Sequence, residues 1–143
     1  MTADTPNEAS VRRYWQRVWS EGDPDAAADF YAAHYRQDGV PRTPAEFSEG
    51  MLRWRSRFPD TTVEVNKLFS TADGRVVVSR VTYRATHLGD LRSIPATGRK
   101  TEVTGIDIFE FNEDGKVVDH WHEADHYGLY TQLGAELQPG AGS

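Results

Sequence analysis

Acidic and imidazole side chains are concentrated in the last third of the sequence, among the apolar residues of a future core. The segments VTGIDIFEF (103–111) and KVVDHWHEAD (116–125) flank the turn sequence NEDG, a pattern that predicts two antiparallel strands. Burying a carboxylate or an imidazole without a partner is costly. A site of acid/base chemistry is therefore expected here, among Asp107, Asp119, His120, His122, Glu123, Asp125 and His126.

Asp125 ends the second of these strands, and its position permits two interpretations. A desolvated carboxylate has a raised pKa and can remove the proton α to a carbonyl group. Asp is also a preferred N-cap residue, and residues 127–133 could form a last helical turn. The residues alone leave both interpretations open.

His120 could donate a proton to an alkoxide, because imidazole titrates close to neutral pH. On a regular strand, however, His120 and His122 face one side, whereas Asp119, Trp121 and Asp125 face the other. The alternative is a histidine in the core or at a subunit interface.

His87 and Asp107 are the remaining catalytic candidates. His87 lies at the end of a predicted strand on its apolar side, so it is either a cavity-mouth or a buried structural histidine. Asp107 alternates with Phe109 and Phe111 and is expected to face a cavity. There it could pair with His87 or share a proton with Asp125.

A metal site is not expected. The spacing His120-x-His122 is ligand-like, but Glu123 is adjacent and faces the opposite side of the strand. Cysteine-based sites, disulfides and thiolate catalysis are excluded because the chain contains no Cys. We predict neither a metal nor a cofactor.

Several aromatic residues could pack the core or stack against a flat substrate, two roles that the sequence does not separate. They are Trp15, Tyr31, Phe47, Trp54, Tyr83 and Phe109.

Helical patterns dominate the first 58 residues. The sequences TPNE (5–8) and TPAE (43–46) each combine an N-cap Thr, a Pro and a capping-box Glu. The first helix should end at Gly22 and the third at Pro59. A second helix, opened by Asp23-Pro24, is expected to place Ala27, Phe30, Tyr31 and His34 on one face.

From Thr61 the apolar period changes to two, and four strands are expected. In the long strand that follows the turn ADGR (72–75), alternate residues from Val77 to His87 should face inward, and residues 88–100 read as a loop. Helices followed by antiparallel strands predict an α+β domain, in which a strongly curved sheet wraps the helices into a cone with one open pocket. We expect a single domain over residues 1–143, with flexible ends at 1–6 and 138–143.

The composition argues against nucleic acid and membranes as partners. The chain has 143 residues, a net charge of −6 and no dense basic cluster, which argues against nucleic acid. It has neither a signal peptide pattern nor an apolar run of about 18 residues. A soluble cytoplasmic protein without a membrane partner is expected.

The order of these elements resembles the nuclear-transport-factor-2-like cone fold. Within it, the motifs resemble the SnoaL-like polyketide cyclases, in VRRYWQRVWSEGDPDAAADFYA, RATHLGDLRSIPATGRK and IFEFNEDGKVVDHWHEADHYGLYTQLG. The resemblance implies an Asp on the last strand that acts as general acid/base in an intramolecular aldol closure, and Asp125 matches it. Related sequences often read HWD where this chain has His120-Trp121-His122, an imidazole where a carboxylate is usual.

The resemblance implies cofactor-free carbon–carbon bond formation on a hydrophobic or aromatic carbonyl substrate. Asp125 would remove the α-proton, His120 or His87 would protonate the alkoxide, and Asp107 would orient an imidazole. A homodimer through the outer sheet face is expected. Two alternatives stay open: a hydroxylase or epoxide hydrolase, for which Arg80 and Arg84 have the wrong strand parity, and a non-catalytic small-molecule-binding protein.

Overall fold

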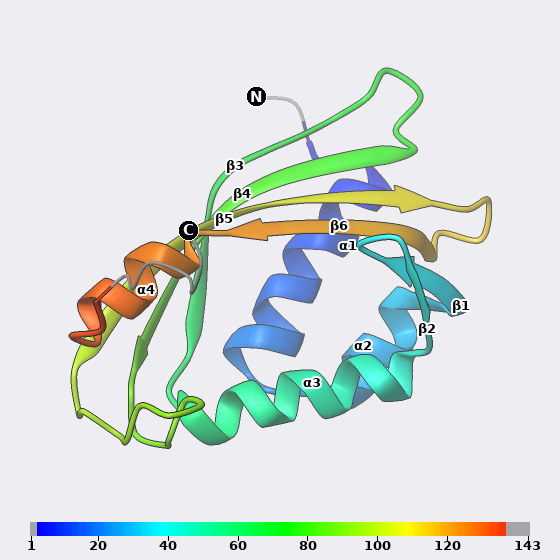
Figure 1. Ribbon diagram of the computed structural model, residues 1–143. Helices are drawn as coiled ribbons and strands as arrows, with labels where there is room; N and C mark the ends of the chain where they lie inside the picture. Colours follow the sequence, from blue (N-terminus) through cyan, green and yellow to red (C-terminus); the bar gives the residue numbers. More distant parts are fainter. Residues whose placement is uncertain (1–2, 137–143) are drawn as a thin grey trace, which may run out of the picture.

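A computed structural model describes residues 3–136 and shows an α+β fold (Figure 1). The helices are α1 (Pro6–Tyr14), the π-helix η1 (Trp15–Ser20), α2 (Pro24–Phe30), α3 (Pro44–Arg57) and α4 (His126–Gln132). The strands are β1 (Tyr31–Gln37), β2 (Val40–Arg42), β3 (Thr62–Ser70), β4 (Val76–Thr86), β5 (Lys100–Phe111) and β6 (Val117–Ala124).

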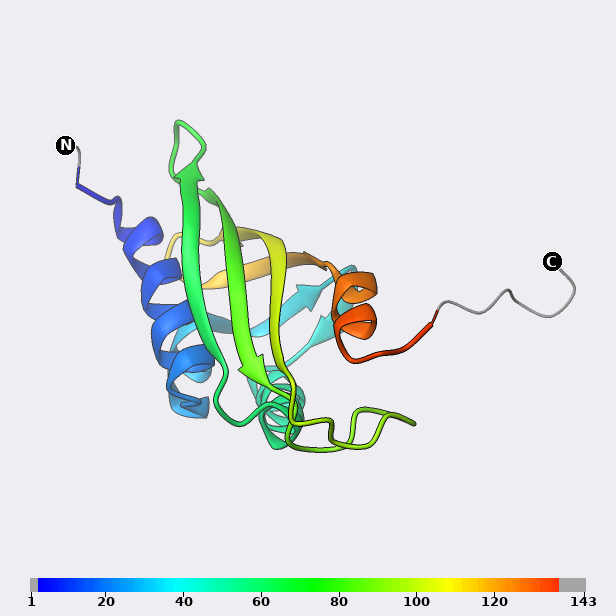
Figure 2. The ribbon, with the colours of Figure 1, turned by 90° about the vertical axis from the view of Figure 1, so that its left-hand side faces the viewer.

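The six strands form one sheet in the order β2-β1-β6-β5-β4-β3. Figures 1 and 2 show that the long strands β3–β5 bend around the N-terminal helices, with α3 crossing below them and α4 at the far end of β6. The predicted fold class, with helices held in a strongly curved sheet, is confirmed. One pairing departs from the antiparallel expectation, because β1 runs parallel to β6.

Both predicted capping boxes are present. The Thr5 hydroxyl accepts from the Glu8 amide at 3.1 Å, and the Glu8 carboxylate accepts from the Thr5 amide at 2.8 Å. Thr43 and Glu46 make the same exchange at the start of α3. Thr5 and Pro6, expected in a flexible end, therefore begin a helix, while residues 137–143 lie outside the described part of the chain.

The first helix changes its winding before it ends at Ser20, two residues before Gly22. In η1 the backbone amides donate to the carbonyl five residues earlier. The Glu21 amide, for example, donates to the Gln16 carbonyl at 2.9 Å. Residues five apart are then stacked on one face, and the Trp19 indole N–H reaches Tyr14 Oη at 2.9 Å. The π-turn thus aims two aromatic side chains into the same space.

The prediction for the second helix was wrong beyond Phe30. Tyr31 and His34 belong to β1, which joins β2 through an Asp38-Gly39 turn. Both turn residues have positive φ, 52° and 82°, as a two-residue hairpin of the primed type requires. The sheet therefore has two strands more than expected: β1 lies beside β6, and β2 forms the edge beyond β1.

The long strand β4 follows the predicted alternation. Val77, Ser79 and Val81 are fully buried against the helices. Among residues 3–136, no helix is long and apolar enough to cross a membrane.

Candidate active site

A cavity of about 290 Å³ lies between the inner face of the sheet and the helices. Its walls come from the end of α1, η1, α3, the β1–β2 hairpin, β4–β6 and α4. Four of the six aromatic residues predicted to contact substrate line it: Trp15, Phe47, Trp54 and Tyr83. Tyr31 and Phe109 are buried in the core behind this wall, where Tyr31 stacks on Tyr35 at 4.1 Å between ring centroids.

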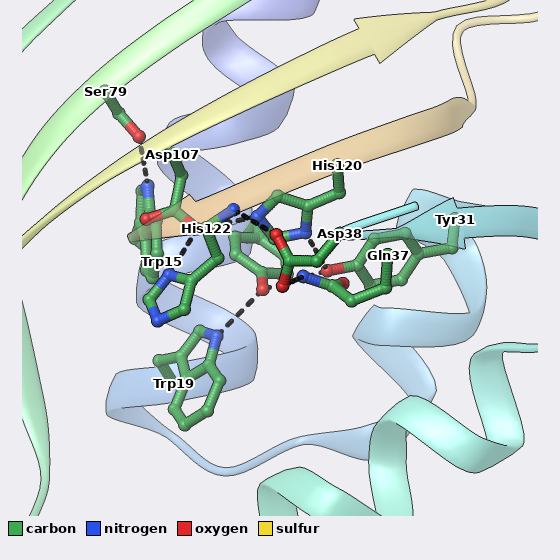
Figure 3. Close-up of polar contacts among 10 residues, drawn as sticks. Trp15, Trp19, Tyr31, Gln37, Asp38, Ser79, Asp107, His120 and His122 are labelled. Atoms are coloured by element: carbon green, nitrogen blue, oxygen red, sulfur yellow. Dashed lines mark hydrogen bonds and ion pairs between the residues drawn. The ribbon is translucent and has the colours of Figure 1, made fainter. Parts of the chain in front are cut away.

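Asp107 is the centre of the polar wall of this cavity (Figure 3). Its Oδ2 atom lies 2.6 Å from Nε2 of His120 and 2.9 Å from Nδ1 of His122. Asp107 and His120 are 1% and 2% exposed, whereas the His122 side chain is 30% exposed. Two imidazoles therefore share one buried carboxylate, and only one of them has substantial access to solvent.

The strand register explains why these residues meet. Asp107 is the direct cross-strand partner of His122, and Phe109 is that of His120. Side chains two apart on a strand point to the same face, so His120 and His122 both turn inward. Trp121 between them turns outward and is 47% exposed. The predicted parity of β6 is confirmed.

Hydrogen bonds shift the pKa values of Asp107 and His122 in opposite directions. Burial alone would raise the pKa of Asp107, but the hydrogen bonds from His120 and His122, with their charges, hold it below its usual range. Burial alone would lower the pKa of His122, but the hydrogen bond to Asp107 and its charge raise it above its usual value. The site favours an ionised Asp107 beside a histidine that binds protons readily.

The orientation of His122 follows from the ionised carboxylate. A carboxylate only accepts, so Nδ1 of His122 carries the donated hydrogen and Nε2 of the neutral ring is left as a lone-pair acceptor. Among the described residues, Nε2 has no hydrogen-bond partner. Since His122 lines the cavity, Nε2 can exchange a proton with a bound molecule.

His120 continues into a second set of hydrogen bonds away from Asp107. Its Nδ1 lies 2.9 Å from Tyr31 Oη, which in turn lies 3.0 Å from Tyr14 Oη. Tyr14 Oη also accepts from the indole N–H of Trp19. Tyr14 and Trp19 both line the cavity, so the chain starts and ends at its wall.

The β1–β2 turn fixes one rim of the cavity. The Asp38 amide donates to the His120 carbonyl at 2.9 Å, and Asp38 Oδ1 accepts from the His122 amide at 2.8 Å. The neighbouring Gln37 also lines the cavity, and its Oε1 is buried without a partner among the described residues. This rim holds the backbone of both histidines and offers an unoccupied acceptor.

Asp125 does not join this centre. Its side chain is exposed, and Oδ1 accepts from the Gly128 amide at 2.8 Å as the N-cap of α4. A Cβ on residue 128 would lie 2.2 Å from Asp125 Oδ2, so the cap depends on a glycine there. Of the two interpretations of Asp125, the structure shows the cap.

His87 also lies outside the cavity wall. It is fully buried, its ring is stacked on Phe58, and its Nδ1 lies 3.0 Å from the Thr97 hydroxyl. The Thr97 amide donates to the same nitrogen at 3.2 Å. His87 therefore anchors the loop after β4, and Asp107 does not pair with it.

Several site residues were missed by the sequence reasoning. His122 is named in the acid/base cluster and weighed as a metal ligand but not assigned a catalytic role, although its shared parity with His120 and the inward expectation for Asp107 already pointed to one. Trp19, Gln37 and Asp38 depend on the π-turn and on β1, which the sequence pattern did not reveal. Among residues 3–136, no group of three or more His, Asp or Glu has the geometry to hold a metal ion.

Comparisons with known proteins agree with this architecture. The sequence model of the SnoaL-like polyketide cyclases matches residues 9–133. Aklanonic acid methyl ester cyclase DauD of Streptomyces sp. (strain C5) is 26% identical over 136 residues, which cover 91% of this chain and 83% of DauD. Aklanonic acid methyl ester cyclase DnrD of Streptomyces peucetius is 27% identical over 130 residues, which cover 87% of this chain and 88% of DnrD.

Among solved structures, TsrD from Streptomyces laurentii superposes with a TM-score of 0.81 and 31% identity. The superposition covers 94% of this chain and all of TsrD. The family match spans most of the sequence, from the first helix to the end of the last. This chain belongs to the SnoaL-like polyketide cyclase family.

Proposed function

We propose that this protein closes a ring in a polyketide-like carbonyl compound by an intramolecular aldol reaction, with His122 as the general base. The observation that carries this proposal is the Asp107–His122 pair: Nδ1 is held at 2.9 Å, and Nε2, at the cavity, has no partner within residues 3–136. A carboxylate that accepts from Nδ1 of an imidazole fixes the tautomer and the orientation of the ring, which can then act as a base at Nε2.

In the proposed reaction, Nε2 of His122 takes a proton from a carbon between two carbonyl groups. The resulting enolate attacks a second carbonyl carbon of the same molecule, which forms the carbon–carbon bond and leaves an alkoxide. The alkoxide then takes up a proton, so the product is an isomer of the substrate. Asp107 stabilises the imidazolium that exists between the two proton transfers.

The assignment moves the base from the predicted Asp125 to His122. Asp107, on the strand that faces His122, supplies the carboxylate of the pair. The proton transfers need only side chains of this chain.

The cavity favours a flat, largely apolar substrate. Trp15, Trp54 and Tyr83 provide aromatic walls, while Asp107 and Gln37 provide polar groups at defined points. The names of DauD and DnrD describe cyclases of aklanonic acid methyl ester. We propose a substrate of the same chemical class, an aromatic polyketide with an acidic carbon between two carbonyl groups.

The test is to incubate the protein with aklanonic acid methyl ester and a panel of aromatic β-keto esters, following binding by fluorescence and products by mass spectrometry. A product of unchanged mass and altered retention is expected. Binding without conversion of any compound would contradict the cyclase proposal and favour the small-molecule-binding alternative. The two arginines considered for the hydrolase alternative, Arg80 and Arg84, bond to Asn66 and Glu64 away from the cavity.

We also propose that the outer sheet face forms a homodimer. Ile108 and Trp121 are cross-strand partners there, and with Ile106 they are 41–50% exposed. Such a contiguous apolar patch is typical of an interface. Light scattering is expected to give a dimer mass for the wild type and a monomer mass for Ile108→Lys. A monomeric wild type would contradict this proposal.

A further inference from the structure

A buried chain of hydrogen bonds leads from Asp107 through His120 and Tyr31 to Tyr14, and the proposed base does not use it. The three steps measure 2.6, 2.9 and 3.0 Å. His120 and Tyr31 are each 2% exposed, so neither reaches solvent. Of these four hydrogen-bonded residues, Asp107, His120 and Tyr14 line the cavity, whereas Tyr31 does not.

Two proton arrangements satisfy this chain, and they differ at Tyr14. When His120 is neutral and donates Nε2–H to Asp107, its Nδ1 must accept from Tyr31, whose oxygen then accepts from Tyr14. When His120 carries a second proton, Nδ1–H donates to Tyr31, and Tyr31 donates to Tyr14. In that arrangement the Tyr14 hydroxyl hydrogen is not used by Tyr31 or His120, so it can be donated to a molecule in the cavity.

Trp19 strengthens this conclusion. An indole N–H can only donate, so Tyr14 Oη must accept from Trp19 in both arrangements. With Tyr31 also donating, the Tyr14 oxygen has two donors and can give up its hydrogen to a third group. Burial and the nearby Asp107 charge raise the pKa of Tyr14, which keeps the hydroxyl protonated until such a transfer.

We propose that Tyr14 is the catalytic acid that donates its proton to the reacting oxygen, with Tyr31 and His120 as the positioning residues that resupply it. This inference rests on the proposed aldol reaction. As the carbon–carbon bond forms, the carbonyl electron pair moves to oxygen, which takes the Tyr14 proton. Tyr31 passes its proton to Tyr14, and His120 passes the Nδ1 proton to Tyr31.

The proton balance closes over the full cycle. One proton is taken from substrate carbon at His122, and one is delivered to substrate oxygen at Tyr14. After the product leaves, His122 releases its proton to water in the cavity, and Tyr14 takes one up and returns it along the same chain to His120. Base and acid are thus separate groups at the cavity wall, coupled through the shared Asp107.

The decisive experiment uses 4-nitrophenol, whose phenolate absorbs visible light and mimics the reacting oxyanion. If Tyr14 donates to that oxygen, Tyr14→Phe is expected to weaken phenolate binding about tenfold or more, because hydrogen bonds to charged groups are strong. The same variant should lower kcat by about a hundredfold or more. Tyr127→Phe, on an exposed tyrosine, is the matched control and should change neither quantity.

Tyr31→Phe tests whether the Tyr31 hydroxyl resupplies the proton of Tyr14, because it removes the hydroxyl and keeps the packed ring. It leaves the Tyr14 hydroxyl in place but interrupts its resupply, so kcat should fall while KM and phenolate affinity stay near their wild-type values. Equal phenolate affinity in wild type and Tyr14→Phe, with both folded by circular dichroism, would overturn the proposal. The phenolate measurement needs no turnover, so it remains decisive even if the cyclase proposal fails.

Discussion

The middle of the β5–β6 pair and the junction of β6 with α4 each contain an aspartate and a histidine, but only the middle forms a reactive centre. Asp107 is 1% exposed and is contacted by two imidazoles. Asp125, next to His126, is exposed and contacts the backbone of α4. The same residue types therefore have different roles eighteen positions apart in the chain.

The two aspartates differ because the backbone groups around them differ in how many hydrogen bonds they still lack. Inside the sheet, most backbone groups are already paired in the ladder, and the inward-facing Asp107 finds its partners among side chains. At the start of a helix, the first amides lack partners and attract the nearest carboxylate. Predicting the reactive aspartate therefore requires the strand register as well as the residue type.

The largest expected effect in this comparison is that of His122→Gln. The amide can still donate to Asp107, but it cannot accept a proton at the Nε2 position, so turnover should fall by about a hundredfold to ten-thousandfold. Ligand affinity should change little. Steady-state kinetics with the substrate that the cyclase assay identifies measures this.

His34→Gln is the matched control, because His34 is an exposed histidine on β1. It should turn over at the wild-type rate. Wild-type activity in His122→Gln would remove His122 from the mechanism and return the search to the other cavity residues.

Asp107→Asn should have the next largest effect, and it should also shift the pH profile. His122 acts as a base only when neutral, so wild-type kcat/KM should rise with pH as His122 loses its proton. Without the Asp107 charge and hydrogen bond, the pKa of His122 should be lower than in the wild type, and the rise should begin at lower pH. The maximal rate should also fall, because the His122 imidazolium loses the charge that stabilises it.

Asp125→Asn is the control for this shift. It removes the same charge from the junction, outside the cavity, and should leave the profile in place. An identical profile for wild type and Asp107→Asn would show that Asp107 does not set the protonation of His122.

Much of the fold could be predicted from local signals. Capping boxes at Thr5 and Thr43 and the alternation of β4 depend on neighbouring residues, and all were confirmed. β1 could not be predicted, because Ala27, Phe30 and Tyr31 have helical spacing. Only the long-range parallel pairing of β1 with β6 makes Tyr31 a strand residue.

The candidate site was predictable in part for the same reason. The inward orientation of Asp107 and the shared face of His120 and His122 follow from alternation within a strand. Which residues meet across two strands depends on register, which the turn and the bulge near Phe111 determine. The catalytic role therefore went to Asp125, chosen by its distance from Trp121 along the chain.

Stability should also depend on pH through the centre of the sheet. The lowered pKa of Asp107 contributes stability above its unfolded value of about 4, and this is lost as pH falls through the folded pKa. The raised pKa of His122 contributes stability below its unfolded value of about 6.5, and this is lost as pH rises through the folded pKa. Both contributions are present between about pH 4 and pH 6.5.

Urea unfolding across this range measures the effect. The free energy of unfolding of the wild type should decline on both sides of the window, whereas Asp107→Asn should flatten both declines. The same pH dependence in wild type and variant would show that other groups control it.

The smallest expected effect is that of Asp125→Ala at the junction. The substitution removes the acceptor for the Gly128 amide, and the loss of an N-cap costs about 1 kcal/mol in the free energy of unfolding. Asp125→Asn, which keeps an acceptor, should cost much less. Because the side chain lies outside the cavity, kcat should stay within about twofold of the wild type, a change well below that expected for removal of a general base. A fall in kcat beyond tenfold with ligand affinity retained would reverse the comparison, since it would make Asp125 the base and the Asp107 pair a structural element of the core.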